Sequence, residues 1–228
     1  DPAGNNNAAS TSTDNTVTFD GTVPNVTVNQ AGTQADPTNN ANISFTVVFS
    51  EAIDPATFVA GDITIGGGAS GVVFGAPATA DNITWTITPS SITPDGAVIP
   101  SIAAGAVSDP AGNGNAASTA TDSSVTYDTT APTVTVNQSS GQSDPTNSLP
   151  LSFAVVFSEA IDPATFTNAA VSNAGSAAGT AFTVTNTGDD TNFTLTASGL
   201  RTDGAVIPSI SASVIQDKAG NTPAASTR

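Results

Sequence analysis

The sequence has 228 residues with 19 acidic and three basic side chains, no histidine and no cysteine, and a formal net charge of −16. This charge excludes nucleic acids and anionic membrane surfaces as partners, and it favours cations, most plausibly divalent ones. Without histidine or cysteine, disulfides, Cys/His zinc sites and His- or Cys-based catalysis are excluded as well. No run of about 18 apolar residues is present, so we expect no membrane-spanning helix.

Shifting the sequence by 108 residues aligns it with itself without a gap. A period of this length corresponds to a whole domain rather than to a solenoid unit. The matching segments are DPAGN at 1–5 and 109–113 with DKAGN at 217–221, VTVNQ at 26–30 and 134–138, VVFSEAIDPATF at 47–58 and 155–166, and DGAVIPSI at 95–102 and 203–210. The two copies differ most at 59–80 and 167–188.

In chain order, the repeat predicts three parts. Residues 1–19 carry the C-terminal loop and the last strand, NTVTF at 15–19, of a preceding repeat. Residues 20–127 form a complete repeat, and residues 128–228 form a second repeat that lacks its last strand. We therefore expect an internal piece of a longer repetitive protein.

Alternating apolar residues predict seven short strands in the complete repeat, separated by turn-rich segments. They lie at 26–28, 43–49, 63–65, 72–74, 83–87, 97–102 and 125–127. Seven strands in about 100 residues predict an all-β fold, an immunoglobulin-like Greek-key sandwich. The whole chain is then predicted to be tandem immunoglobulin-like sandwiches arranged end to end.

Three motifs together carry a family resemblance: VVFSEAIDPATF, then DGAVIPSIAAGAVSDPAGN, then a strand followed by DTTAP. This pattern resembles the bacterial immunoglobulin-like tandem repeats of S-layer proteins and giant calcium-dependent cell-surface adhesins. The resemblance covers essentially the whole chain. It implies an extracellular location at the cell surface, calcium at the joints between domains, and a structural or adhesive role rather than an enzymatic one.

The expected strand order brings acidic side chains from three segments to one end of each sandwich. These segments are the linker before each repeat (DGTVP at 20–24 and DTTAP at 128–132), the loop after the second strand and the loop after the sixth strand. We expect metal ligands at Asp20, Glu51, Asp54, Asp109 and Asn113 in the first repeat and at Asp128, Glu159, Asp162, Asp217 and Asn221 in the second. Carboxylates so placed repel one another, and hard oxygen ligands suit Ca²⁺. Alternatively, DPAGN is only a stable turn. In either case, Asp36 and Asp95 at the opposite end are expected to be turn residues rather than ligands.

These features predict a calcium-stiffened spacer of a long cell-surface protein or filament. Its partners would be neighbouring repeats of the same chain, with surface glycans or host molecules reached through other domains. An alternative is a carbohydrate-binding module that uses 59–80 and 167–188. Paired carboxylates can hydrolyse glycosidic bonds, but nothing in the sequence indicates a cleft or aromatic platforms for sugar, so we expect no enzyme.

The unpaired last strand at 15–19 has two explanations. One is that the sequence is a segment of a longer array. The other is a self-assembling filament or surface-layer subunit, in which residues 13–19 of one chain continue the second repeat of another, head to tail. The register permits this, because the motifs beginning at Asp1 and Asp217 lie two full periods apart.

Overall fold

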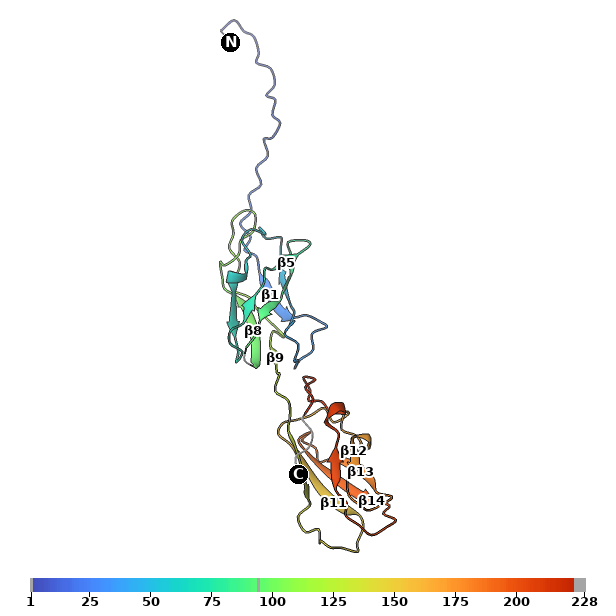
Figure 1. Ribbon diagram of the computed structural model, residues 1–228. Helices are drawn as coiled ribbons and strands as arrows, with labels where there is room; N and C mark the ends of the chain where they lie inside the picture. Colours follow the sequence, from blue (N-terminus) through green and yellow to red (C-terminus); the bar gives the residue numbers. More distant parts are fainter. Residues whose placement is uncertain (1, 94, 224–228) are drawn as a thin grey trace.

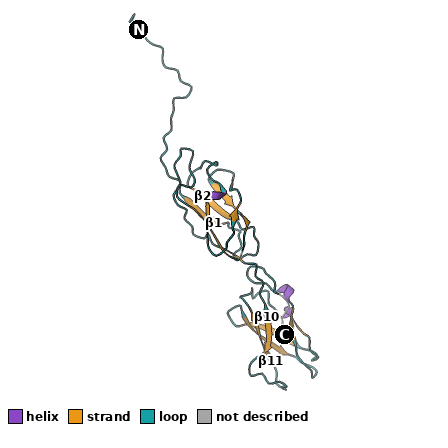
Figure 2. Cartoon of the chain, turned by 60° about the vertical axis from the view of Figure 1, so that its left-hand side comes forward, coloured by secondary structure: helices purple, strands orange, loops and turns teal. Residues whose placement is uncertain are grey.

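The computed structural model describes residues 2–93 and 95–223 of the chain. Figure 1 shows an extended N-terminal segment, a first β-sandwich coloured blue to green and a second coloured yellow to red. Strands and loops make up almost all of the chain, as the colouring of Figure 2 shows. The described helices are 3₁₀ turns of three residues, and none has the length or hydrophobicity to cross a bilayer.

The first sandwich is built from antiparallel sheets. One sheet has the order β1-β2-β6-β5, another β3-β8-β9, and β4 pairs with β7. Their bounds are β1 Val26–Gln30, β2 Phe45–Phe49, β3 Ile63–Gly66, β4 Val73–Phe74, β5 Ala78–Thr79, β6 Thr84–Ile87, β7 Pro89–Ser91, β8 Gly96–Ile102 and β9 Val125–Tyr127, with the 3₁₀ turn η1 at Ala60–Asp62. Each of the seven predicted strands is present, and β5 and β7 are additional short strands.

The second sandwich repeats this pattern. One sheet has the order β10-β11-β14-β13, and β12 pairs with β15. The bounds are β10 Val134–Gln138, β11 Leu151–Phe157, β12 Val171–Asn173, β13 Ala181–Asn186, β14 Asn192–Ser198 and β15 Pro208–Ile210, with 3₁₀ turns η2 at Asn168–Ala170 and η3 at Ala212–Val214. The register is also repeated, since Val26 pairs with Phe49 and Val134 with Phe157. The prediction of an all-β fold is confirmed.

Each sandwich has its own hydrophobic core, which follows from the alternation of apolar residues along the strands. One core runs from Val26 to Val125 and the other from Val134 to Ile215. Edge-to-face aromatic contacts lie at the centre of both. Phe58 packs on Phe49 and Trp85, with ring centroids 5.7 and 5.2 Å apart. In the second core, Phe157, Phe166 and Phe193 make the corresponding cluster at 5.1–5.7 Å.

The N-terminal segment lies outside both cores. Residues 15–19 form no strand, and the side chains of Val17 and Phe19 are 93% and 94% exposed. The prediction that they complete a preceding repeat therefore stays a prediction.

Candidate metal centre

The structure brings three carboxylates together at the start of each sandwich. In the first, Asp20, Glu51 and Asp109 each offer one oxygen, and these oxygens lie within 4.8 Å of one another. In the second, Asp128, Glu159 and Asp217 make the same cluster, again within 4.8 Å. We call these the first and second carboxylate clusters. Each joins the linker, the loop after β2 or β11, and the DPAGN or DKAGN loop.

The DPAGN loop fixes the buried member of the first cluster. Asp109 is 3% exposed, and its Oδ1 accepts hydrogen bonds from the backbone N–H groups of Ala111 (2.9 Å) and Asn113 (2.8 Å). Gly112 has φ +92°, a conformation that L side chains rarely adopt, and this closes the turn. Local turn chemistry therefore accounts for the position of this carboxylate. It does not account for the other two, which come from distant segments.

Asn113 ties the loop to the linker. Its side-chain amide donates to Asp109 Oδ2 (2.8 Å) and to the backbone carbonyl of Asp20 (3.2 Å). Asn221 repeats both bonds, to Asp217 Oδ2 (2.9 Å) and to the carbonyl of Asp128 (2.9 Å). The fifth residue of the motif thus places the linker aspartate beside the loop aspartate.

The glutamate of each cluster is electrostatically unfavourable as placed. Burial raises the pKa of Glu51, and the nearby charges of Asp20 and Asp109 raise it further. Its Oε1 is buried and has no hydrogen-bond partner among the described residues. Glu159 behaves alike, since burial and the charges of the second cluster raise its pKa. By contrast, the hydrogen bond from the Asn113 side chain lowers the pKa of Asp109.

Four predicted ligands take other roles in the structure. Asp54 and Asp162 lie outside the clusters, and their Oδ1 atoms accept the backbone N–H groups of Ala56 and Ala164 at 3.0 Å. Asn113 and Asn221 present their amide nitrogens to the loop aspartate rather than their oxygens. The structure thus brings together three of the four carboxylates predicted for each end.

The second cluster lies beside the loops at the far end of the first sandwich. Asp95 accepts hydrogen bonds from the hydroxyls of Thr129 (2.7 Å) and Thr130 (2.8 Å) in the linker. Its charge is a further cause of the raised pKa of Glu159. Asn39 donates from its side chain to Asn221 Oδ1 (3.1 Å) and from its backbone to the carbonyl of Ala219 (3.1 Å). Sequence reasoning expected Asp95 to be a turn residue that faces the second repeat in an end-to-end array. It did not single out Asn39, whose partners lie in the DKAGN loop of the other sandwich.

The donor set fits a hard divalent cation. Ca²⁺ binds six to eight oxygens at about 2.3–2.6 Å, so two ligands of one ion lie at most about 5 Å apart. The carboxylate oxygens of each cluster meet this limit, being within 4.8 Å of one another. Carbonyl and water oxygens could complete the shell. Such a cation would also neutralise charges that repel each other.

The predicted alternative, a carbohydrate-binding module, would use residues 59–80. A cavity of about 540 Å³ is lined in part by residues of this segment. Its lining is mostly apolar and includes Phe58, Pro77 and Trp85. Trp85 is only 3% exposed, so its ring offers no open face for stacking on a sugar.

Fold and cluster geometry together define a β-sandwich protein with an acidic cluster at the start of each sandwich. Residues 128–228 match the family model described as a bacterial Ig-like domain, which is less than half of the chain. The immunoglobulin-like fold is confirmed, and residues 128–228 are similar to bacterial Ig-like domains. No curated protein and no solved structure matches the sequence.

Proposed function

We propose that this chain is a structural spacer of a long extracellular cell-surface protein, stiffened by calcium at the joint between its sandwiches. The observation that carries the proposal is the placement of the second carboxylate cluster. It contains the linker residue Asp128, and its loop contacts the first sandwich through Asn221 and Asn39. A cation bound there would hold the linker, the second sandwich and the end of the first in one arrangement.

The mechanism is the removal of repulsion together with the ordering of a linker. Without a cation, three carboxylates within 4.8 Å oppose the compact joint. With one, the linker becomes part of a closed ligand shell. Extracellular calcium modules bind with dissociation constants of about 0.1–1 mM, which matches the calcium outside cells rather than inside them. Several such joints in series would convert a flexible chain of domains into a rigid, extended array.

Thermal unfolding tests calcium binding. At calcium ten times the dissociation constant, one site adds about 1.4 kcal/mol, which corresponds to a rise in Tm of roughly 6–11 °C for a domain of this size. We expect this rise with millimolar calcium, a smaller one with magnesium and none with a chelator. Asp217→Ala should abolish the rise in the second sandwich.

Asp162→Asn is the matched control, because it removes the same charge from the same end of the sandwich. Asn keeps a side-chain oxygen for the N–H of Ala164, so the turn survives. The calcium response should be retained in this variant. Superimposable curves in calcium and chelator for the unmodified chain would refute a calcium site.

Small-angle scattering tests the stiffening itself. If calcium fixes the two sandwiches relative to each other, the chain should populate a narrower range of maximum dimensions with calcium than with chelator. This effect should be lost in Asp128→Ala, which removes the linker ligand. A calcium-dependent Tm without any change in scattering would leave the clusters as domain-stabilising sites and overturn the spacer mechanism.

A further inference from the structure

The first sandwich contains a cavity of about 540 Å³ beside its edge strand β5. Its lining comes from Pro55, residues 58–60, residues 76–79 and Trp85 of β6. Apart from the hydroxyl of Thr79 and the indole N–H of Trp85, these side chains are apolar. Small-molecule sites in proteins have volumes of about 300–1,000 Å³ and mostly apolar linings with a few polar groups. The cavity has both properties.

The indole nitrogen of Trp85 is an unused hydrogen-bond donor at this cavity. Trp85 is 3% exposed, and its Nε1 is buried without a hydrogen-bond partner among the described residues. The other polar side chain of the lining is already engaged, since the Thr79 hydroxyl donates to the carbonyl of Thr84 (2.8 Å). A buried indole N–H usually has a partner, because an unpaired buried donor loses its hydrogen bond to water and gains nothing in return. Trp85 therefore points to an acceptor that the described residues do not supply.

The second sandwich joins the corresponding segments with its own residues. Asn168, in the turn η2, accepts a hydrogen bond at Oδ1 from the backbone N–H of Val184 in β13 (2.8 Å), and Val184 packs against the second core. The 108-residue shift places Ala60 on Asn168, and alanine cannot make this bond. Phe193 stands at the position of Trp85. The second sandwich thus lacks the indole donor and ties together directly the two segments that line the cavity in the first.

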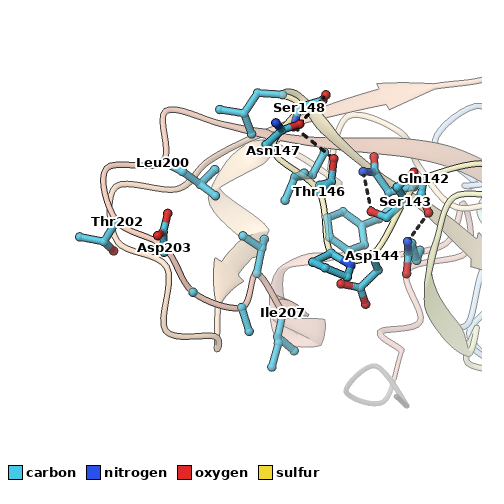
Figure 3. Close-up of a pocket in the computed structure, with 18 of the residues that line it drawn as sticks. Gln142, Ser143, Asp144, Thr146, Asn147, Ser148, Leu200, Thr202, Asp203 and Ile207 are labelled. Atoms are coloured by element: carbon cyan, nitrogen blue, oxygen red, sulfur yellow. Dashed lines mark hydrogen bonds between the residues drawn. The ribbon is translucent and has the colours of Figure 1, made fainter.

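A larger cavity in the second sandwich offers no such donor. It has a volume of about 1020 Å³, and Figure 3 shows Asp144 and Thr146 on one wall and the segment from Leu200 to Ile207 on the other. Among the described residues that line it, no buried side-chain nitrogen or oxygen lacks a hydrogen-bond partner. Its volume alone does not indicate a ligand, whereas the smaller cavity combines an apolar space with an unpaired donor.

We propose that the cavity of the first sandwich binds a small, neutral, largely apolar molecule with one carbonyl oxygen, which accepts the indole N–H of Trp85. The apolar lining selects against a sugar, whose many hydroxyls would be buried without partners. The net charge of −16 disfavours an anion. A cationic group, which only donates hydrogen bonds, would leave the indole N–H unpaired. A ketone, ester or amide attached to a ring or a branched chain meets all three conditions.

The cavity can fill from solution because part of its lining is exposed. Val59 is 53% exposed, and Pro55 and Ala78 are exposed as well. A ligand bound here would cover part of this apolar surface and connect η1 with β5, the counterparts of the segments that Asn168 and Val184 join in the second sandwich. It would give the first sandwich a binding role beyond that of a spacer. This inference goes beyond the calcium proposal and does not depend on it.

Nuclear magnetic resonance tests the contact directly, because Trp85 is the single tryptophan and its indole N–H gives one signal. The probe is 4-fluoroacetophenone, a neutral ring with one carbonyl oxygen, added to the full chain in chelator. We expect a saturable downfield shift of the indole proton as the carbonyl accepts it. The anion 4-fluorobenzoate, which has the same ring, should give no such shift. An unmoved indole signal up to the solubility limit of the ketone would overturn the proposal, as would equal binding of the benzoate.

Two substitutions separate the hydrogen bond from the apolar space, with the fluorine signal of the ketone as the measure of affinity. Trp85→Phe removes the donor and introduces the residue that the second sandwich has at this position, so the fold should persist. Affinity should then fall about 3–10-fold, the usual contribution of one neutral hydrogen bond. Ala60→Leu adds bulk to the lining and should abolish binding. Ala104→Leu, in an exposed turn, is the matched control and should leave binding unchanged.

The combination of results decides the inference. Binding that survives both Trp85→Phe and Ala60→Leu would place the probe elsewhere on the chain and overturn it. Loss in Ala60→Leu with full affinity in Trp85→Phe would show an apolar cavity without recognition by the indole, which overturns it too. The amide spectrum of each variant confirms that the sandwich is folded before its affinity is measured.

Discussion

Replacing Glu159 by Gln should stabilise the metal-free protein and destabilise the calcium-bound one. The change removes one of the three charges of the second cluster, whose oxygens lie within 4.8 Å. Two unit charges at that distance repel by about 0.9 kcal/mol in water and about 3.5 kcal/mol at an effective dielectric constant of 20. Glu159 is partly exposed, so salt and solvent reduce its two repulsions to a total of about 1 kcal/mol. We expect Tm to rise by about 4–8 °C in chelator.

In calcium the sign reverses. The amide of Gln is a neutral and weaker ligand than a carboxylate, so the calcium-induced rise in Tm should shrink or vanish. The unmodified chain would then be the more stable of the two in millimolar calcium. This reversal of the stability difference identifies Glu159 as a metal ligand. If Glu159 were only repelled by its neighbours, Glu159→Gln would be the more stable protein both in chelator and in calcium.

Calorimetry in chelator and in calcium provides the measurement, and tryptophan fluorescence assigns the transitions. Trp85 is the single tryptophan and lies in the core of the first sandwich, so its signal follows that sandwich. Glu159→Gln should leave that signal unchanged in chelator, while Glu51→Gln should shift it. The electrostatic reasoning would be refuted if Glu159→Gln left Tm unchanged or lowered it in chelator while the calcium response remained intact.

Two further predictions concern pH and the burial of two equivalent phenylalanines. The pKa values of Glu51 and Glu159 are raised in the folded state, so protonation of these groups favours the fold. The metal-free chain should therefore gain stability from them as pH falls from 7 toward about 5. This stability is lost as pH rises through the folded-state pKa. Protons compete with calcium there, so the Tm difference between calcium and chelator, measured by calorimetry across this range, should close. Phe45→Ala should lower the free energy of unfolding measured in urea by about 3–5 kcal/mol, because Phe45 is fully buried. Phe153→Ala should cost clearly less, since Phe153 is only partly buried, and equal costs would contradict this difference in burial.

Much of the fold could be predicted because the strands alternate strictly and the repeat fixes their register. The shift of 108 residues reappears in the pairing of Val26 with Phe49 and of Val134 with Phe157. The short strands β5 and β7 could not be predicted, since their sequences, Ala78–Thr79 and Pro89–Ser91, show no alternation of apolar residues. They depend on pairing with β6 and β4, which is a tertiary effect.

The clusters were predictable in outline and not in detail. Strand order alone brings the linker and two loops to one end, which places Asp20, Glu51 and Asp109 together. The direction of a side chain within a loop is set locally. Asp54 turns toward the N–H of Ala56, and Asn113 turns its amide nitrogen toward an acceptor that only the folded linker supplies. A sequence shows which groups can donate or accept but not which of these they do.

One segment has the same sequence in both repeats and a different structure in each. DGAVIPSI occurs at 95–102 and at 203–210. In the first copy it forms the seven-residue strand β8, and in the second only the three residues of β15 are strand. Both copies pair with an inner strand at their C-terminal half, Ile63 opposite Ile102 and Val171 opposite Ile210. Only residues 96–98 also pair with β9. Since local propensity is the same, the partner strand decides the difference.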